Sequence, residues 1–577
     1  MKNSKHIIVS GAPEGFDARL ILDEVAKGGP VAHVARDDKR LAALQSSLAF
    51  FAPDMPVFVF PGWDCLPYDR VSPNADISAA RMAVLAGLVH GLPEKFVLLT
   101  TMSAATQRVP ARSLLRDAAF KARVGDRIDE SALRQFLVRM GFTQSPTVME
   151  AGDYAVRGGI IDIYPPGQTG PIRLDLFGDV LDGARRFDPD TQRTTETLKD
   201  IELAPVSEVI LDEAAITRFR QNYRIEFGAA GTDDPLYEAV SAGRKHGGIE
   251  HWLGFFQDDL ETLFDYLPRV TISLDDQISP QRLARWESIA DQYGTRMHAL
   301  TQKRRMDSVY KPAKPALLYL DDAAWDAALA DKRVLQFSPN KQTTGVGVID
   351  AGARDGRNFA PERQQEKISL FSALAGHIKA KLEVGPVIIA SYSEGARERL
   401  MGLIEDEGIT ETIPVSDFKR VGKHGVHLAV WTLDAGFETP EFTVISEQDV
   451  LGDRLIRSGK RKRRADNFLT EANSLAPEDL VVHVDHGVGR FVGLEVITAI
   501  GAAHECLLIE YAENSKLYLP VENIELLSKY GHEEGLLDKL GGGAWQAKKA
   551  RLKERIREMA DRLIRIAAER ALRRAPI

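Results

Sequence analysis

The stretch that decides the fold is HIIVSG at 6–11, a short apolar run that ends in a glycine and precedes an amphipathic segment at 16–27. The same order of apolar run and amphipathic segment repeats with VAHVARD and 39–51, and with VFVFPGWD and 77–90, before FVLLTT closes the series. Short β-branched runs separated by helical patterns of about ten residues predict βαβ units. We therefore expect a parallel sheet with helices on both faces, an α/β domain.

Downstream of that domain the pattern changes to alternating strands with turn signals. The runs GGIIDIYPPG and IRLDLFGD and the segment 198–209 predict an antiparallel β insert, with one helix over 130–140. Strand and helix patterns return from 206 to 340, which we interpret as the second half of the first domain. After a polar, glycine-rich stretch at 340–358, a smaller α/β unit is predicted up to residue 452.

The remaining residues predict a linker, a small β domain and a helix. The run SGKRKRRAD at 458–466 has no apolar periodicity and is typical of a solvated linker. Short alternating strands with tight turns follow over about sixty residues, which fits a small barrel of the SH3 or Tudor size. In the helix that follows, apolar residues step by four, three, four and three and so share one stripe. These residues are Leu552, Ile556, Met559, Leu563 and Ile566.

The composition fits several packed cores and excludes a single small binding module. The chain has 577 residues, is 44% hydrophobic and carries a formal net charge of −9. At about 150 residues per domain, this length corresponds to roughly four domains. The charge is uneven, because residues 546–577 hold eleven Lys or Arg and four acids, an excess of +7 that leaves −16 for the rest. Any contact with nucleic acid is therefore expected at the basic segment rather than over the whole surface.

The cysteine content and the hydropathy indicate a reducing, aqueous environment. The two cysteines, Cys65 and Cys506, lie far apart in the sequence, which excludes a disulfide framework and a cysteine-based zinc site within the chain. The first residues are polar, and no stretch approaches the ~18 unbroken apolar residues of a membrane span. We expect a cytoplasmic protein with no membrane partner.

The first apolar run ends at Gly11, where a phosphate-binding loop begins in α/β nucleotide hydrolases. That loop, G-x-x-x-x-G-K-[ST], needs glycines for close backbone approach, a lysine on the phosphates and a hydroxyl on magnesium. Counted from Gly11, these three places hold Phe16, Asp17 and Ala18, with Gly15 just before them. Since a carboxylate repels phosphate, we interpret residues 11–18 as a degenerate, non-functional nucleotide loop and expect no ATP hydrolysis by this mechanism.

Two other groups could carry chemistry, and a structural role explains each of them better. Glu447 and Asp449 follow the apolar run FTVIS and could imitate a magnesium-binding pair, but acids at a helix start are favoured. His483 and His486 lie on a strand and turn pattern without an obvious third ligand. A histidine that braces the turn before Gly487 is therefore favoured over a metal ligand. No catalytic constellation and no metal site is predicted.

Two neighbouring predicted strands of the insert carry arginines beside an aromatic residue. Arg157 lies in YAVRGGIIDIYP, and Arg173 and Phe177 lie in IRLDLFG. Arginine and phenylalanine are typical interface anchors, because one supplies a planar hydrogen-bonding fork and the other a large buried area. The residues alone leave open whether this is a binding patch or a solvated strand face.

Several long motifs resemble known repair proteins. VRGGIIDIYPP, IRLDLFGD and RRFDPDTQRT resemble the segment shared by the excision-repair protein UvrB and the transcription-repair coupling factor family. FPGWDCLPYDRVSPNADISAARM, VVHVDHGVGRFVGLEVI and LGGGAWQAKKAR are similar to the coupling factors specifically. The likeness extends from residue 30 onward, with the motifs in the right order. UvrB keeps an intact Walker loop, whereas this loop is degenerate, as it is in the UvrB-like module of the coupling factors.

This resemblance implies an α/β multidomain protein with seven segments. In chain order these are the first part of a degenerate UvrB-like α/β domain (1–118), an inserted mixed α+β UvrA-binding domain (119–205), the second part of the UvrB-like domain (206–340), a small α/β domain of unassigned role (341–452), a basic linker (453–475), an RNA-polymerase-interacting SH3- or Tudor-like β barrel (476–540) and a basic helix that leads to the translocase (541–577). The family's ATP-dependent translocase, of helicase superfamily two, is expected to follow residue 577. ATP, Mg²⁺ and most contact with double-stranded DNA would belong to it, so we expect no cofactor in these residues.

The resemblance also implies the binding residues. Arg157, Arg173 and Phe177 match the face of UvrB that contacts UvrA, and the barrel strands match the region that docks on the β subunit of RNA polymerase. The barrel residues are His486, Gly487, Val488, Gly489, Arg490, Ile497, Leu507, Leu508 and Tyr511. For a single apolar one of them, core packing is the alternative. The arginines of the basic helix either lie near DNA or are simply solvated.

The function implied is that of an adaptor. It would bind a stalled RNA polymerase through the barrel and recruit UvrA through the insert, for transcription-coupled nucleotide excision repair. One alternative is a UvrB-like, ATP-dependent damage-recognition subunit, which needs a nucleotide site that the loop at 11–18 does not supply. A second alternative is a polymerase-binding regulator similar to the CarD family, which the long stretch before the barrel disfavours.

Overall fold

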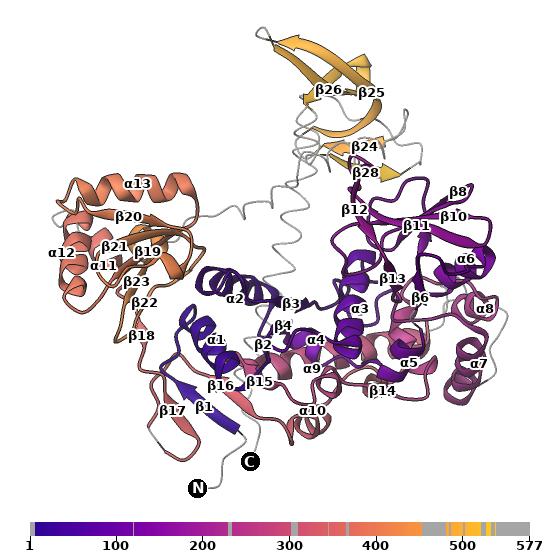
Figure 1. Cartoon of the computed structure of the whole chain (residues 1–577), viewed down its shortest axis with the longest axis horizontal. Coiled ribbons are helices and arrows are strands. Elements are labelled where there is room, and N and C mark those ends of the chain that lie inside the picture. Colours follow the sequence, from indigo (N-terminus) through magenta and orange to yellow (C-terminus); the bar gives the residue numbers. More distant parts are fainter. Residues whose placement is uncertain are drawn as a thin grey trace. The chain divides into compact units, whose positions relative to one another are not determined.

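The structure is a computed structural model that describes residues 6–118, 120–228, 234–301, 310–343, 345–364, 369–452, 480–483, 486–499, 502–520, 527–531 and 537. The chain divides into two compact units, Met1–Arg454 and Leu455–Ile577 (Figure 1). Within the described ranges, no helix is long and apolar enough to cross a membrane. The predicted linker at 453–475 and the predicted helix at 541–577 lie outside the described residues.

The first unit contains a seven-stranded parallel sheet, which confirms the prediction of an α/β protein with a parallel sheet. Each of its strand pairs runs parallel. In spatial order the strands are β17 (Val348–Asp350), β1 (His6–Ser10), β16 (Val334–Phe337), β15 (Thr271–Leu274), β2 (Val31–Ala35), β4 (Val97–Thr101) and β3 (Val57–Phe60). Strands β15 and β16 follow the insert in the chain, so this sheet is assembled from both sides of the insert.

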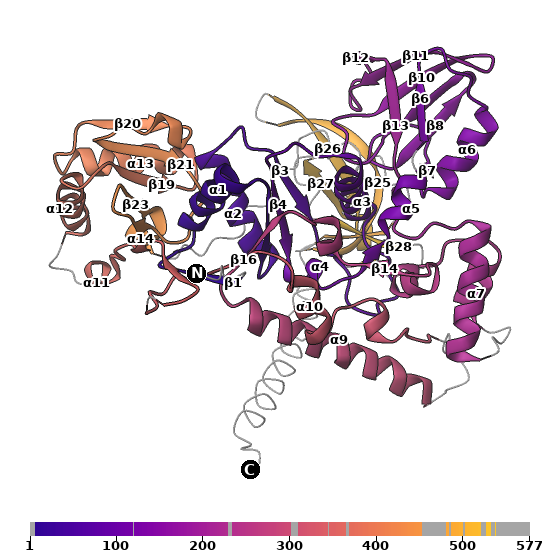
Figure 2. The same cartoon turned by 60° about the horizontal axis from the view of Figure 1, so that its bottom comes forward.

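Both faces of this sheet are buried, as parallel strands require. The residues of β2 show that both faces are covered. Val31 and Ala35 belong to the core under α1 (Phe16–Gly28) and α2 (Asp38–Phe51). Ala32 and Val34 belong to the opposite core. That second core includes α3 (Ala75–His90), α4 (Met102–Ala105) and α10 (Asp322–Leu329). The long helix α9 (Ile278–Thr301) packs against α4 (Figure 2).

The insert leaves this domain through β6 (Phe120–Arg123) and returns through β13 (Asp200–Leu203), which pair with each other. Its main sheet has six strands. In spatial order they are β12 (Thr194–Leu198), β11 (Val180–Phe187), β10 (Ile172–Phe177), β9 (Ile160–Ile163), β8 (Asp153–Arg157) and β7 (Thr143–Gln144). The pairs from β12 to β8 are antiparallel, and only β7 with β8 is parallel. Helix α6 (Glu130–Arg139) covers one face of the sheet, as the pattern over 130–140 predicts.

A buried ion pair ties the returning end of the insert to α3. The guanidinium of Arg81, fully buried, pairs with the carboxylate of Glu208, which also accepts a hydrogen bond from Trp63 Nε1 at 3.2 Å. Beyond this point, α7 (Glu213–Phe227) and α8 (Pro235–Ser241) pack with the aromatic segment Ile249–Phe255. Ala79 of α3 also belongs to the buried core of the insert, which attaches the insert to the first domain.

The small α/β part of the first unit has a six-stranded sheet. In spatial order its strands are β18 (Arg354–Asp355), β22 (Phe437–Glu438), β23 (Thr443–Ser446), β19 (Val387–Ser391), β21 (Val426–Val430) and β20 (Thr412–Val415). The four strands from β23 to β20 are parallel, whereas β22 and β18 pair in antiparallel fashion at one edge. Helices α12 (Leu370–Leu382), α13 (Glu394–Glu405) and α14 (Glu447–Leu451) contribute to its core.

The second unit contains an antiparallel five-stranded sheet. Its order is β27 (Lys516–Pro520), β26 (Ala502–Glu510), β25 (Gly487–Ala499), β24 (Leu480–His483) and β28 (Leu527–Gly531). In the part of this unit that the structure describes, β27 and β28 lie at opposite edges and do not pair. The strands predicted for a small SH3- or Tudor-like barrel are present, but the described sheet does not close. Alternation predicts strands and turns, but closure depends on tilt and stagger across the whole sheet, which a local pattern does not specify.

Candidate functional site

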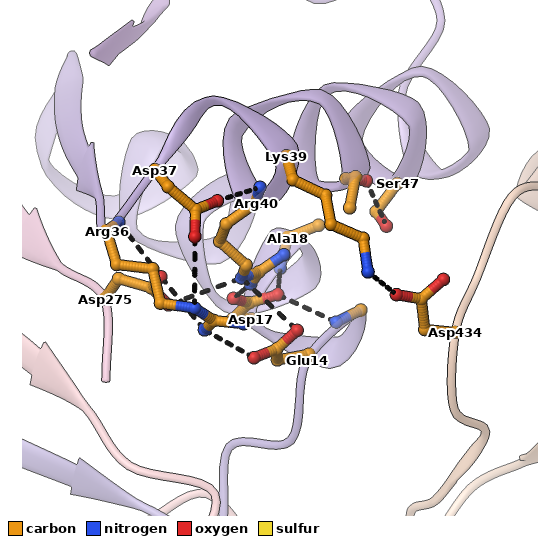
Figure 3. A network of polar contacts seen from close by, with 12 residues as sticks. Glu14, Asp17, Ala18, Arg36, Asp37, Lys39, Arg40, Ser47, Asp275 and Asp434 are labelled. Atoms are coloured by element: carbon orange, nitrogen blue, oxygen red, sulfur yellow. Dashed lines mark hydrogen bonds and ion pairs between the residues drawn. The ribbon is translucent and has the colours of Figure 1, made fainter. Parts of the chain in front are cut away.

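Residues 11–15 connect β1 to α1, and residues 16–18 form the start of α1, at the position predicted for a nucleotide loop (Figure 3). Gly11 and Gly15 have φ angles of 64° and 94°, in the left-handed region that glycine adopts without a steric penalty. The three residues that replace the second glycine, the lysine and the hydroxyl are all buried at the start of α1. They are Phe16, Asp17 and Ala18. The loop therefore has glycines at two left-handed positions, while the side chains at positions 16–18 are turned into the protein.

The carboxylate of Asp17 lies where such a loop would bind a phosphate group. Its Oδ1 accepts hydrogen bonds from the backbone N–H groups of Gly15, at 3.0 Å, and Ala18, at 2.9 Å. Its Oδ2 pairs with the guanidinium of Arg40 (Figure 3). Free N–H groups at a helix N-terminus are what attract a phosphate. Here an internal anion already accepts their hydrogen bonds.

Other backbone N–H groups of the loop also have partners within the protein. They donate to carbonyl oxygens at 2.9–3.4 Å, so they are not directed at an open site. The donors are Gly11, Ala12, Phe16 and Asp17, and the acceptors are the carbonyl groups of Asn340, Ser338 and Pro13. The hydrogen-bonding capacity that a nucleotide would need is therefore largely used inside the fold.

Charged side chains surround the Asp17 carboxylate. Arg40, which is buried, also donates from Nε to Asp275 Oδ1 at 3.3 Å, and Arg36 reaches both Asp275 and Glu14. Burial raises the pKa of Asp17, while Arg40 opposes that shift. Burial by itself would lower the pKa of Arg40, but the carboxylates around it, Asp17 first, raise it above its ordinary value. The network is thus a set of mutually neutralising charges rather than an open anion site.

Side chains of the small α/β part cover the same loop. A Cβ atom built on Gly15 would lie 2.7 Å from Leu433 Cδ1 and 3.1 Å from Phe437 Cε1. The rings of Phe16 and Phe437 are 5.6 Å apart. Leu433 and Phe437 belong to the same buried cluster as Phe16, so apolar atoms fill the space above the loop.

The aromatic contact continues onto α2. The indole of Trp431 stacks on the ring of Phe50 with centroids 4.4 Å apart, and its Nε1–H donates to Ser47 Oγ at 3.2 Å. At the rim, Lys39 forms an ion pair with Asp434 at 2.8 Å. Sequence reasoning did not find this contact, because its two sides are almost 400 positions apart in the chain and each reads as ordinary core.

The sheet of the insert has an inner and an outer face, because successive strand residues point to opposite sides. Ile161, Ile172 and Leu174 are buried in the core of the insert. The alternate residues Arg173 and Phe177 lie on the outer face, and cross-strand pairing places Arg157 there too. The structure therefore brings the three residues predicted to bind UvrA onto one face.

Arg173 is engaged within the sheet. Its Nε and Nη2 atoms donate to the two carboxylate oxygens of Asp162 at 2.7 Å and 2.9 Å, and its guanidinium lies 4.7 Å from the centre of the Phe187 ring. The hydrogen bond to Asp162 raises the pKa of Arg173. Arg173 consequently has fewer donors left for a partner than its sequence position suggests.

Phe177 and Arg157 are open to solvent. The Phe177 side chain is 83% exposed at the end of β10, and Arg157 is exposed, with one bond from Nη2 to the carbonyl oxygen of Pro146 at 2.6 Å. Ile160, which sequence reasoning missed, is 38% exposed and pairs across the strands with Arg157. The glycine pair before Ile160 was the available signal, since it marks a turn that puts these two residues opposite each other.

In the second unit, three of the predicted polymerase-binding residues form core rather than surface. Leu507, Leu508 and Tyr511 are buried, so their side chains cannot reach a partner in this arrangement. Gly489 is needed for packing, because a Cβ there would lie 2.6 Å from Ile509 Cγ2. The side chain of Ile497 lies outside the described residues. Of the other predicted positions, His486, Gly487, Val488 and Arg490 lie on β25 or directly before it.

Exposed apolar side chains occur further along β25. Leu494 is 40% exposed and Val496 is 68% exposed, and their spacing of two places them on one side of the strand. Tyr518 on β27 is 38% exposed, but its cross-strand partner is Leu508, which belongs to the opposite side of the sheet from Leu494. Sequence alternation did not separate these sides, because the pairing shifts by one residue at a bulge between Phe491 and Gly493.

One of the two structural interpretations made from the sequence is confirmed. Glu447 and Asp449 lie in the first turn of α14, where Ser446 and Asp449 form a reciprocal capping box, so they are acids at a helix start as predicted. The rings of His483 and His486 stack at 4.6 Å beside the turn. No group of three His, Cys, Asp or Glu side chains that could hold a metal ion occurs among the described residues.

Comparison with known proteins gives two family matches within the chain. A family described as the UvrB interaction domain matches residues 120–208, and one described as the CarD-like/TRCF RID domain matches residues 475–531. These ranges correspond to the insert and to the sheet of the second unit.

Three relatives illustrate the similarity over the whole length. Transcription-repair-coupling factor of Rickettsia bellii is 32% identical over 545 residues, which is 93% of this chain and 47% of that protein. The Escherichia coli protein of the same name is 32% identical over 97% of this chain and 48% of its own length, and that of Haemophilus influenzae is 30% identical over 98% and 49%. The chain spans about half the length of the curated relatives it matches. The resemblance that the motifs indicated is confirmed.

Proposed function

We propose that this chain, a relative of the transcription-repair coupling factors, is an adaptor in transcription-coupled nucleotide excision repair. It binds the β subunit of a stalled RNA polymerase through the sheet of its second unit, and it recruits UvrA through the outer face of its insert. The observation that carries the proposal is the outer face itself. It holds Phe177, 83% exposed, and the exposed Arg157 on a sheet whose other side is firmly packed. Aromatic and arginine anchors on a rigid base are the residues that dominate binding energy.

Replacing Phe177 or Arg157 with alanine is expected to weaken UvrA binding about thirtyfold, since such anchors typically contribute about 2 kcal/mol. Neither change should lower the melting temperature, because both side chains are exposed. Isothermal titration of purified UvrA into the chain measures the effect. Val138→Ala, at an exposed position on α6 and away from this face, is the control. Wild-type affinity in both variants would reject the assignment.

For the polymerase contact we propose the exposed side of β25 rather than the buried residues named from the sequence. Leu507 pairs across the strands with Leu494 and lies buried on the same side of the sheet, whereas Leu508 belongs to the opposite side. Changing Val496 or Leu494 to aspartate is expected to reduce binding of the isolated polymerase β subunit at least about tenfold, because an apolar contact would be replaced by a desolvated charge. Tyr518→Ala, equally exposed on the other side, should bind normally. If a pull-down showed weak binding by Tyr518→Ala and normal binding by the two aspartate variants, the contact would lie on the Tyr518 side of the sheet.

We propose that the chain performs this role without nucleotide chemistry at residues 11–18. The support is the Asp17 carboxylate among the loop N–H groups and the apolar cover from Leu433 and Phe437. The same features speak against a UvrB-like, ATP-dependent subunit. ATP, Mg²⁺ and the main contact with double-stranded DNA are assigned to the translocase of the full-length family proteins, and no cofactor is assigned to these residues.

The seven segments given above remain our proposal for the domain division, with a cytoplasmic location. Their support is the pair of compact units and the family matches at 120–208 and 475–531. The match to the UvrB interaction domain also disfavours a CarD-like regulator, whose resemblance is restricted to the second unit. Arg173 also belongs to the proposed UvrA-binding surface. Its role there is to hold Asp162 through two hydrogen bonds rather than to contact UvrA with a free guanidinium.

A further inference from the structure

The outer face of the insert is organised in rows of cross-strand partners. One row runs from Arg157 through Ile160 and Asp175 to Gly183, across four strands. Phe177 follows Asp175 by two residues on β10, so its side chain rises on the same face next to this row. The row therefore starts at the proposed anchor Arg157, passes beside the proposed anchor Phe177 and ends at Gly183, which has no side chain.

No feature of the fold requires a glycine at position 183. Its φ angle does not lie in the left-handed region, although it sits beside the register shift of β10 and β11. A Cβ built there would meet its nearest neighbour, Asp175 Oδ2, at 3.4 Å, which is ordinary van der Waals contact. A glycine inside a strand weakens the strand, because it loses more backbone entropy on folding and offers no side chain to pack. A glycine in a strand often marks a bulge, such as the neighbouring register shift, or a site where another backbone or a ligand approaches closely.

The surroundings of Gly183 indicate what approaches. Asp175 forms an ion pair with Arg185 at 2.7 Å, and the neighbouring row is neutralised by the pair of Arg173 with Asp162. The charges next to Gly183 are thus matched within the sheet. The exposed apolar side chains of this face are Phe177 and Ile160, and the exposed Arg157 lies beyond Ile160 at the far end of the row.

We propose that Gly183 leaves a notch in the outer face, into which an apolar side chain of UvrA packs beside Phe177. This inference rests on the proposed function of the insert and adds a residue that determines the fit. The notch explains why a strand position that tolerates a side chain lacks one. In this contact the apolar side chain of UvrA lies next to the Phe177 ring, and Ile160 and Arg157 border the same surface.

The test fills the notch and leaves the anchors intact. Gly183→Val is expected to weaken binding of purified UvrA by about tenfold or more, with a smaller loss for Gly183→Ala. The melting temperature should stay the same or rise, since valine suits a strand better than glycine. Thr197→Val is the matched control, because Thr197 is exposed on the edge strand β12 and pairs with Arg185 on the same outer face. Its affinity should change by less than about twofold.

The outcomes separate this inference from the proposed function. Normal affinity in Gly183→Val, combined with weak binding in Phe177→Ala, would overturn the notch and keep the surface. Normal affinity in both Phe177→Ala and Arg157→Ala would reject the surface itself. If Gly183→Val folds poorly, Gly183→Cys gives a second readout. A small thiol reagent should modify this cysteine more slowly when UvrA is bound, with the wild-type chain, which has Cys65 and Cys506, as the background. An unchanged rate would overturn the inference.

Discussion

Replacement of Arg40 by methionine is expected to lower the free energy of unfolding of the first unit by about 3–5 kcal/mol, the usual cost of breaking a buried ion pair from one side. The change leaves Asp17 and Asp275, both buried, without the cation that lies between them. Methionine has a similar length and no polar hydrogen, so packing is largely retained while Asp17 loses its cation and Asp275 keeps only Arg36. Urea unfolding of the full chain, followed by circular dichroism, measures the loss.

The deficit of Arg40→Met should grow with pH. Burial already raises the pKa of Asp17 and Arg40 opposes that shift, so removing Arg40 raises the pKa further. A carboxylate whose pKa is higher in the folded state than in the unfolded state stabilises the fold at low pH, and this contribution is lost as the pH rises through the folded-state pKa. The variant should therefore be closer to wild type at pH 5 than at pH 8.

Two further variants control this result. Arg19→Met removes an exposed pair with Asp23 and should cost less than about 1 kcal/mol at either pH. Asp17→Asn combined with Arg40→Met should recover part of the loss, because one of the two buried charges is then neutral. A deficit that is small, or that stays the same from pH 5 to pH 8, would show that the network is not a set of interdependent buried charges.

Truncation of Trp431 to alanine is expected to cost about 3–5 kcal/mol, as large-to-small changes of buried aromatic residues do. The indole stacks on Phe50 at 4.4 Å and donates to Ser47, so truncation removes both the packing and a hydrogen bond between the small α/β part and α2. Trp431→Phe keeps most of the ring contact and should cost only about 1 kcal/mol for the lost hydrogen bond.

The same variants can be compared by hydrogen exchange at residues 11–18. If the small α/β part covers the degenerate loop through this contact, the amides of the loop should exchange faster in Trp431→Ala than in Trp431→Phe. Equal unfolding free energies and equal exchange in the two variants would show that the stack contributes nothing beyond local packing.

The sequence predicted the parts of the fold that depend on local pattern. β-Branched runs such as VAHVA are buried on both sides, and only a parallel sheet covered on both faces provides that environment, so the first domain could be predicted. The single helix of the insert begins at Asp129, whose carboxylate caps it, again a local signal. The open arrangement of the described five-stranded sheet could not be predicted, because it depends on contacts between distant strands.

The candidate sites could be predicted less completely, for the same reason. Motif likeness located Arg157, Arg173 and Phe177, and all three share the outer face, but only the structure shows that Arg173 is held by Asp162. In β25 the bulge at Phe491 shifts the alternation, so exposed and buried positions could not be assigned by counting. Gly183 gave no signal, since a glycine after Asp182 in LDGARR looks like an ordinary turn.

The carboxylate of Asp17 also determines what a lysine at this position would do. A lysine at position 17 would put a second cation beside Arg40 and withdraw the acceptor that Gly15 and Ala18 now use. Leu433 and Phe437 would still occupy the space above the loop. A phosphate site at residues 11–18 would therefore require changes both in the loop and around Leu433 and Phe437. The residues that stabilise the present structure of the loop therefore also prevent a single substitution from creating a phosphate site there.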